Sequence, residues 1–208
     1  MKLKLFPSII LSILVLTGFA FAGNNATKIK TITNVKKAII GETTASAKYA
    51  AYAEKARKEG YTKIALLFEA ASKSEKIHAG NHRAVLEQLG DKINDFTPKY
   101  DVKSTKENLQ DAINGETYEV TTMYPDFIRT ASDAGINIAM LSFNYAYQTE
   151  KKHKEFYKNA LQMLENNKQN ELPSKYLVCT TCGNTYDNNA PARCGISMTP
   201  RERFITIN

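Results

Sequence analysis

Two copies of the sequence Glu-x-x-His constrain the fold of this chain more than any other feature. They are Glu75-x-x-His78 and Glu150-x-x-His153. Residues three apart lie on the same face of a helix, so each copy directs a carboxylate and an imidazole toward one point. Two such helices that face each other can share a metal site.

The helical pattern around these motifs extends over most of the chain. Apolar residues recur every three or four positions in four segments, of which the first ends at Gly60 and the second at Gly90. Residues 91–103 lack this periodicity, and such a long crossover lets a bundle place its second helix pair beside the first. We therefore expect an all-α four-helix bundle over residues 30–167.

The third predicted helix has recognisable start and stop signals. It begins at a capping box formed by Ser104 and Glu107, and it ends near Gly135. Pro125 lies inside it and predicts a kink, because proline cannot donate the backbone hydrogen bond of a helix.

Carboxylates interrupt the apolar face of every predicted helix, and no Lys or Arg lies on these faces. Burying unpaired carboxylates costs several kcal/mol per ion, so a buried cluster needs cations. One Glu from each of two helices, plus Glu-x-x-His from each of the other two, is the known di-iron carboxylate pattern, to which this chain adds Glu119. Carboxylate and imidazole ligands suit iron or manganese. The predicted ligands are Glu42, Glu75, His78, Glu116, Glu119, Glu150 and His153.

The alternative is that these glutamates lie solvated at helix edges, which a single motif would not exclude; the case rests on all four helices together. His82 has no Glu three positions before it, so we expect a packed residue that supports the ligands from behind. Tyr49 and Tyr124 are either core residues or hydrogen-bond donors to the ligating carboxylates.

The C-terminal segment, residues 175–208, is too short to fold without a staple. It contains two knuckle-like sequences, Cys179-x-x-Cys182 and Cys194-x-x-Ser197. Three states stay open: one iron held by three thiolates with Ser197, hydroxide or Met198; a structural zinc or a Cys179–Cys182 disulfide; or a module that has lost its metal.

The N-terminus resembles an export signal over residues 1–22. Lys2 and Lys4 precede an apolar run, and Ala20-Phe21-Ala22 before Gly23 is typical of a cleavage site. We expect a periplasmic or secreted protein with no membrane contact after cleavage. The net charge of +7 does not indicate a nucleic-acid partner, because aromatic and basic residues do not interleave on one face.

Together these residues resemble the rubrerythrin family. The matching sequences are Gly41-Glu42, the two Glu-x-x-His motifs, Gly115-Glu116-Thr-Tyr-Glu119 and Met123-Tyr124-Pro125. The tail resembles the small rubredoxin-like module of that family, although Ser197 replaces a cysteine and the loop between the knuckles is one residue short. The resemblance covers nearly all of the chain after the signal, and it implies a ferritin-like four-helix bundle with a C-terminal rubredoxin-like metal-knuckle module.

The resemblance also implies a function. It implies a peroxidase with two iron ions that reduces hydrogen peroxide to water, with Glu119 and His78 exchanging as ligands between redox states. Electrons would come from a small redox protein through one iron (or zinc-substituted) site in the tail, across a homodimer or higher oligomer. Three rivals stay open: a ferroxidase or iron-storage protein, a non-catalytic metal-binding protein, and an oxidase or hydroxylase of organic substrates.

Overall fold

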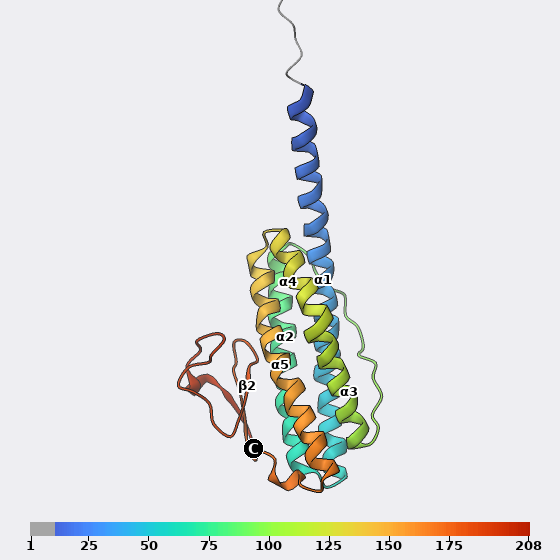
Figure 1. Ribbon diagram of the computed structural model, residues 1–208, viewed down its shortest axis with the longest axis vertical. Helices are drawn as coiled ribbons and strands as arrows, with labels where there is room; N and C mark the ends of the chain where they lie inside the picture. The colour runs from blue at the N-terminus through green and yellow to red at the C-terminus, as the bar shows by residue number, and fades with distance from the viewer. Residues whose placement is uncertain (1–10) are drawn as a thin grey trace, which may run out of the picture.

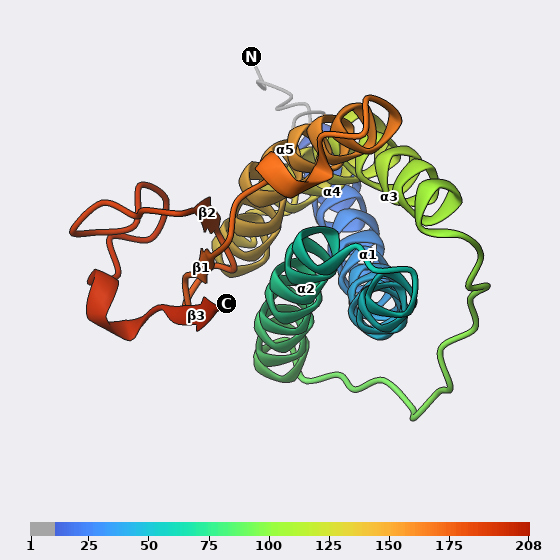
Figure 2. The same ribbon diagram turned by 90° about the horizontal axis from the view of Figure 1, so that it is seen from below.

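The computed structural model describes the backbone of residues 11–208 and the side chains of residues 25–208. Its bundle consists of α1 (Leu11–Lys58), α2 (Thr62–Gln88), α3 (Thr105–Tyr118), η1 (Glu119–Met123), α4 (Tyr124–Asp133) and α5 (Asn137–Glu165). The segments α3, η1 and α4 together form the third long helix of the bundle, and the extended crossover precedes α3 (Figures 1 and 2). The predicted four-helix bundle is therefore confirmed.

The signals that bound the helices act as the sequence indicates. Gly60, Gly90 and Gly135 adopt positive φ after α1, α2 and α4, a conformation that costs a residue without Cβ little. At the start of α3, Ser104 accepts a hydrogen bond from the Glu107 backbone, and the Glu107 side chain bonds back to the Ser104 backbone. This is the predicted capping box.

The expected disturbance at Pro125 takes the form of a π-helical turn rather than a simple kink. In η1 the backbone N–H of Tyr124 bonds to the carbonyl oxygen of Glu119, five residues earlier. The wider turn lies immediately before Pro125, the residue that cannot donate a backbone hydrogen bond. The extra residue changes the helical phase between α3 and α4, while Glu116 and Glu119 both precede it and lie three residues apart in α-helical backbone.

The apolar core is divided into two clusters, with the predicted metal ligands between them. One cluster contains Tyr49, Phe68, Leu109 and Tyr157, and the other contains Val35, Leu86, Phe127 and Phe143. On every long helix the buried carboxylates fall between the residues of the two clusters. The polar layer is thus closed off from solvent at both ends by packed side chains.

The N-terminal part of α1 projects beyond the other helices (Figure 1). The structure has one continuous helix from Leu11 to Lys58. Residues 1–10 of the predicted signal lie outside the described residues. The side chains at its predicted cleavage site, around Gly23, also lie outside them. Among the described residues, none of the helices has both the length and the apolar character needed to cross a membrane.

The tail forms a small three-stranded antiparallel sheet in the order β2-β1-β3, composed of β1 (Tyr176–Val178), β2 (Thr185–Asp187) and β3 (Ile205–Ile207). Two short 3-10 turns, η2 (Gln169–Glu171) and η3 (Arg201–Arg203), complete it. This module lies against α2 and α5, on one side of the bundle (Figure 2).

Candidate metal centres

Six of the seven predicted bundle ligands converge in the polar layer. They form two groups whose possible ligand atoms lie within 4.8 Å of one another. The first group contains Glu42, Glu75, His78 and Glu150, and the second contains Glu75, Glu116, Glu150 and His153. All six residues are buried.

Two carboxylates belong to both groups. Glu75 places one oxygen 2.9 Å from Nδ1 of His78 and the other 3.1 Å from Nδ1 of His153. Glu150 does the same, with its two oxygens 2.8 Å from each of these nitrogens. Glu75 and Glu150 therefore contact the histidines of both groups, whereas Glu42 belongs only to the first group and Glu116 only to the second.

The unsatisfied atoms of this layer fit two cations. Several buried side-chain atoms of this layer have no hydrogen-bond partner in the part of the chain that the structure describes, among them both carboxylate oxygens of Glu75 and of Glu150, and Nδ1 of His78 and of His153. These nitrogens and oxygens nevertheless lie only 2.8–3.1 Å apart. Uncompensated buried polar groups are costly, and a metal ion in each group would satisfy them.

The electrostatics of the layer are those of crowded carboxylates. Burial raises the pKa of Glu42 to about 7, against the lowering effect of His78. Burial, followed by the charges of Glu150 and Glu75, raises the pKa of Glu116 well above its ordinary value. Without metal, these groups hold protons that a cation would displace.

Glu119 is the one predicted ligand that the structure leaves outside both groups. It is partly buried at the start of η1, where burial and the charges of Glu42 and Glu150 raise its pKa. His78 instead occupies the first group.

Two tyrosine hydroxyls donate hydrogen bonds to candidate ligand carboxylates. Tyr124 donates a short hydrogen bond to Oε1 of Glu42, and Tyr49 donates one of 2.7 Å to Oε1 of Glu116. Nε2 of His82 lies 3.2 Å from the Tyr124 hydroxyl. His82 is therefore packed as expected, and of the two alternatives for Tyr49 and Tyr124 the structure has hydrogen bonds to the candidate carboxylates.

Ser142 completes this chain of contacts and was not predicted. Its hydroxyl lies 2.7 Å from Nδ1 of His82, and burial lowers the pKa of His82 to about 3, so that its ring is neutral. Nothing in the sequence spacing marks this serine, because the contact joins α5 to α2.

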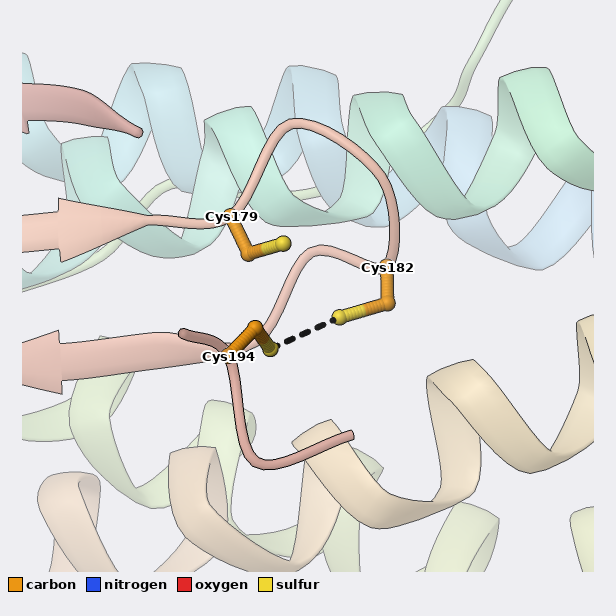
Figure 3. A group of neighbouring side chains, drawn as sticks. All are labelled: Cys179, Cys182 and Cys194. Atoms are coloured by element: carbon orange, nitrogen blue, oxygen red, sulfur yellow. Dashed lines mark hydrogen bonds between the residues drawn. The ribbon is translucent and has the colours of Figure 1, made fainter. Parts of the chain in front are cut away.

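The three cysteines of the tail also converge (Figure 3). Sγ of Cys182 lies 3.4 Å from Sγ of Cys194, and Sγ of Cys179 lies 3.3 Å from Oγ of Ser197. All three cysteines are free thiols, so the structure has no Cys179–Cys182 disulfide. The hydrogen bond from Cys182 lowers the pKa of Cys179 to about 4, and the same contact raises that of Cys182. Three sulfurs and one hydroxyl oxygen surrounding a point suit a tetrahedral iron or zinc site.

The first knuckle of the tail docks directly onto the histidines of the bundle. The carbonyl oxygen of Cys182 lies 3.0 Å from Nε2 of His78, and Oγ1 of Thr185 lies 2.9 Å from Nε2 of His153. Ser74 donates a 2.8 Å hydrogen bond to the carbonyl of Gly183. Within the one chain, the tail module therefore contacts both histidines of the polar layer directly.

Comparison with known proteins identifies the family. A sequence model described as Rubrerythrin matches residues 33–161, which is more than half of the chain. The chain belongs to the rubrerythrin family. Nigerythrin of Nitratidesulfovibrio vulgaris is 35% identical over 192 residues, covering 90% of this chain and 92% of that protein. Rubrerythrin-1 of Clostridium acetobutylicum is 34% identical over 181 residues, covering 84% and 93%.

Solved structures agree with this assignment. The fully reduced, all-ferrous state of nigerythrin superimposes with a TM-score of 0.76 at 35% identity, covering 85% of this chain and 86% of that chain. A bacterioferritin of Desulfovibrio desulfuricans, with a TM-score of 0.63 at 18% identity over 71% of this chain and 87% of that chain, shares the fold alone. This rubrerythrin-family chain is therefore a ferritin-like bundle with a rubredoxin-like module, and its family implies iron as the metal.

Proposed function

We propose that this protein is a di-iron peroxidase that reduces hydrogen peroxide to water. The observation that carries the proposal is the sharing of Glu75 and Glu150 between two adjacent four-ligand groups. Two ions held by the same two carboxylates stay close together, which favours a reaction that needs two electrons at one place.

The overall reaction consumes one hydrogen peroxide, two electrons and two protons and yields two waters. A pair of ferrous ions supplies both electrons when bound. Glu75 and Glu150 fix the spacing of the two positions, while Tyr124 and Tyr49 hold Glu42 and Glu116 in place. Glu119 lies outside both groups, and we propose that it enters the first group when His78 leaves it.

The tail is the proposed route for returning electrons. A metal held by the tail cysteines would be bound by Cys182, whose backbone carbonyl oxygen lies 3.0 Å from Nε2 of His78. Three thiolates and Ser197 are the proposed ligands of this iron. A small redox protein is the proposed donor, and a homodimer or higher oligomer the proposed assembly.

The test is an anaerobic titration of the reduced, iron-loaded protein with hydrogen peroxide, following the absorbance of bundle and tail iron separately. The proposal requires one peroxide per two bundle irons, followed by bleaching of the tail absorbance when electrons are supplied. Uptake of many irons per chain with oxygen, and no turnover with peroxide, would instead establish the ferroxidase alternative.

A matched pair of variants assigns the signals. Glu75→Ala with Glu150→Ala removes the shared ligands and should abolish peroxide consumption. Glu155→Ala removes an exposed carboxylate of the same helix and should leave it unchanged.

A further inference from the structure

One lysine of the bundle reaches into the tail module. Nζ of Lys152, on α5, lies 4.2 Å from the centroid of the Tyr186 ring in β2. At this distance an ammonium group over an aromatic face is a favourable cation–π contact. Lys152 is partly buried and directly precedes the candidate ligand His153 in the sequence.

Tyr186 connects this lysine to the cysteine cluster. Its hydroxyl accepts hydrogen bonds from the backbone N–H of Gly195 at 2.9 Å and from Nδ2 of Asn184 at 2.7 Å. Because two donors occupy the oxygen lone pairs, the phenolic hydrogen is directed to Sγ of Cys194, 3.6 Å away. The ring is held in place by stacking on Phe204, at 5.7 Å between centroids.

The positive charge of Lys152 interacts with two of the tail sulfurs. Among residues 25–208, Lys152 has no carboxylate within ion-pair distance, although the charge of Asp187 does reach it. The same electrostatic interaction links Lys152 to Cys194 and Cys182. The cysteines are buried and packed by Tyr145, Ile196 and Phe204, and low-polarity surroundings weaken the screening of charge.

We propose that Lys152 raises the reduction potential of the metal held by the tail cysteines when the module is docked. The inference rests on the proposed function, which places a redox-active iron in the tail. Reduction adds one negative charge to the site, and an ammonium group nearby stabilises the reduced state more than the oxidised state. The polarised Tyr186 hydroxyl acts in the same direction, because a hydrogen bond to a thiolate stabilises its negative charge.

A second consequence follows from thermodynamic reciprocity. Lys152 belongs to the bundle, so the module experiences its charge only when docked. If docking favours the reduced tail, reduction must tighten docking by the same factor. The tail module would then dock onto the bundle with higher affinity when its metal is reduced than when its metal is oxidised.

The test is spectroelectrochemical titration of the tail iron in the full-length, iron-loaded protein. Lys152→Gln should lower the ferrous-to-ferric ratio at fixed potential by about tenfold, which is about 59 mV for one electron. Lys152→Arg, which keeps the charge and the ring contact, should restore the wild-type value. Lys151→Gln is the matched control, since its Nζ lies over the Tyr147 ring instead, at 4.8 Å.

A further variant separates this effect from a general structural change. Gly183→Ala is expected to undock the module, because a Cβ at this position would lie 2.4 Å from Nε2 of His78. Its tail potential should fall as in Lys152→Gln, and combining the two changes should add little. Additive shifts, or equal shifts in the Lys151 and Lys152 variants, would overturn the inference.

Failure of the inference is distinguishable from failure of the proposed function. A wild-type tail that takes up no iron would overturn the inference, whereas peroxide consumption by the bundle is measured independently. If Lys152→Gln lowers the reduction potential of the tail iron in a protein that does not consume peroxide, the inference about Lys152 holds and the proposed peroxidase activity is rejected.

Discussion

Nε2 of His78 lies 3.0 Å from the carbonyl oxygen of Cys182, so one hydrogen bond joins a candidate ligand of the bundle to a candidate ligand of the tail. The other ring nitrogen of His78 faces Glu75 and Glu150. The imidazole is therefore a direct hydrogen-bonded connection between the two candidate metal centres. Its position also fixes the orientation that a metal ligand requires.

The shared carboxylates should determine how much metal the bundle binds. Replacing both Glu75 and Glu150 by Ala removes a ligand pair from each group, so both bundle irons should be lost. Metal analysis per folded chain measures this, with Glu155→Ala as the control. Retention of two bundle irons in the double variant would show that Glu75 and Glu150 are not the ligands of this centre.

Gly183 should be essential for docking of the module. Besides its contact with His78, an added Cβ would lie 2.7 Å from Oγ of Ser74, and the residue has a φ of +77°. Overpacking and strain of this kind cost about 1–3 kcal/mol, so Gly183→Ala should lower the denaturation midpoint and slow electron transfer from tail to bundle. Gly80→Ala is the control, since a Cβ there meets nothing within 4 Å. Equal effects of the two variants would contradict the docking geometry.

Tyr124 should strengthen metal binding at the first group. Tyr124→Phe removes the hydrogen bond to Glu42 and leaves Nε2 of His82 without its phenol partner. Loss of such a supporting contact typically weakens metal affinity by about 10–100-fold. Competition with a chelator measures this at the bundle, and Tyr147→Phe, a phenol in the same apolar cluster, should have little effect. Unchanged affinity in the Tyr124 variant would show that the phenol only packs.

Ser197 should be a ligand of the tail metal. Its hydroxyl lies 2.8 Å from Oγ1 of Thr199, which in turn donates to Thr181. This chain keeps the Ser197 oxygen beside Cys179. Ser197→Cys should raise the affinity for iron and add a thiolate charge-transfer band, while Ser197→Ala should weaken binding. Identical spectra and metal content in wild type and Ser197→Ala would exclude the oxygen ligand.

The N-terminus of the exported protein should be Gly23. We propose this from the charged start, the apolar run and the Ala20-Phe21-Ala22 sequence. Intact-mass measurement of the protein purified from its native host tests it, and Ala20→Leu with Ala22→Leu, which removes the small residues, should block cleavage. An uncleaved N-terminus in the wild type would favour a retained anchor.

Local patterns in the sequence were enough to predict the four helices and the six candidate ligands that the structure brings together in the bundle. Helical periodicity fixes which residues share a face, and buried carboxylates without basic partners leave cations as the compensating charge. The two Glu-x-x-His motifs are local in sequence, so their geometry follows from the helix alone. The capping box and the glycine stops are local for the same reason.

The remaining features of the site depend on how the helices and the tail pack together. The spanning role of Glu75 and Glu150 depends on the separation and rotation of α2 and α5. The π-helical turn before Pro125, and the grouping of His78 rather than Glu119 with Glu42, Glu75 and Glu150, are likewise features of the three-dimensional arrangement. The contacts of Ser142 with His82 and of Cys182 with His78 join residues far apart in the chain. Such contacts are set by how elements pack and not by local spacing, which is why no pattern in the sequence predicts them.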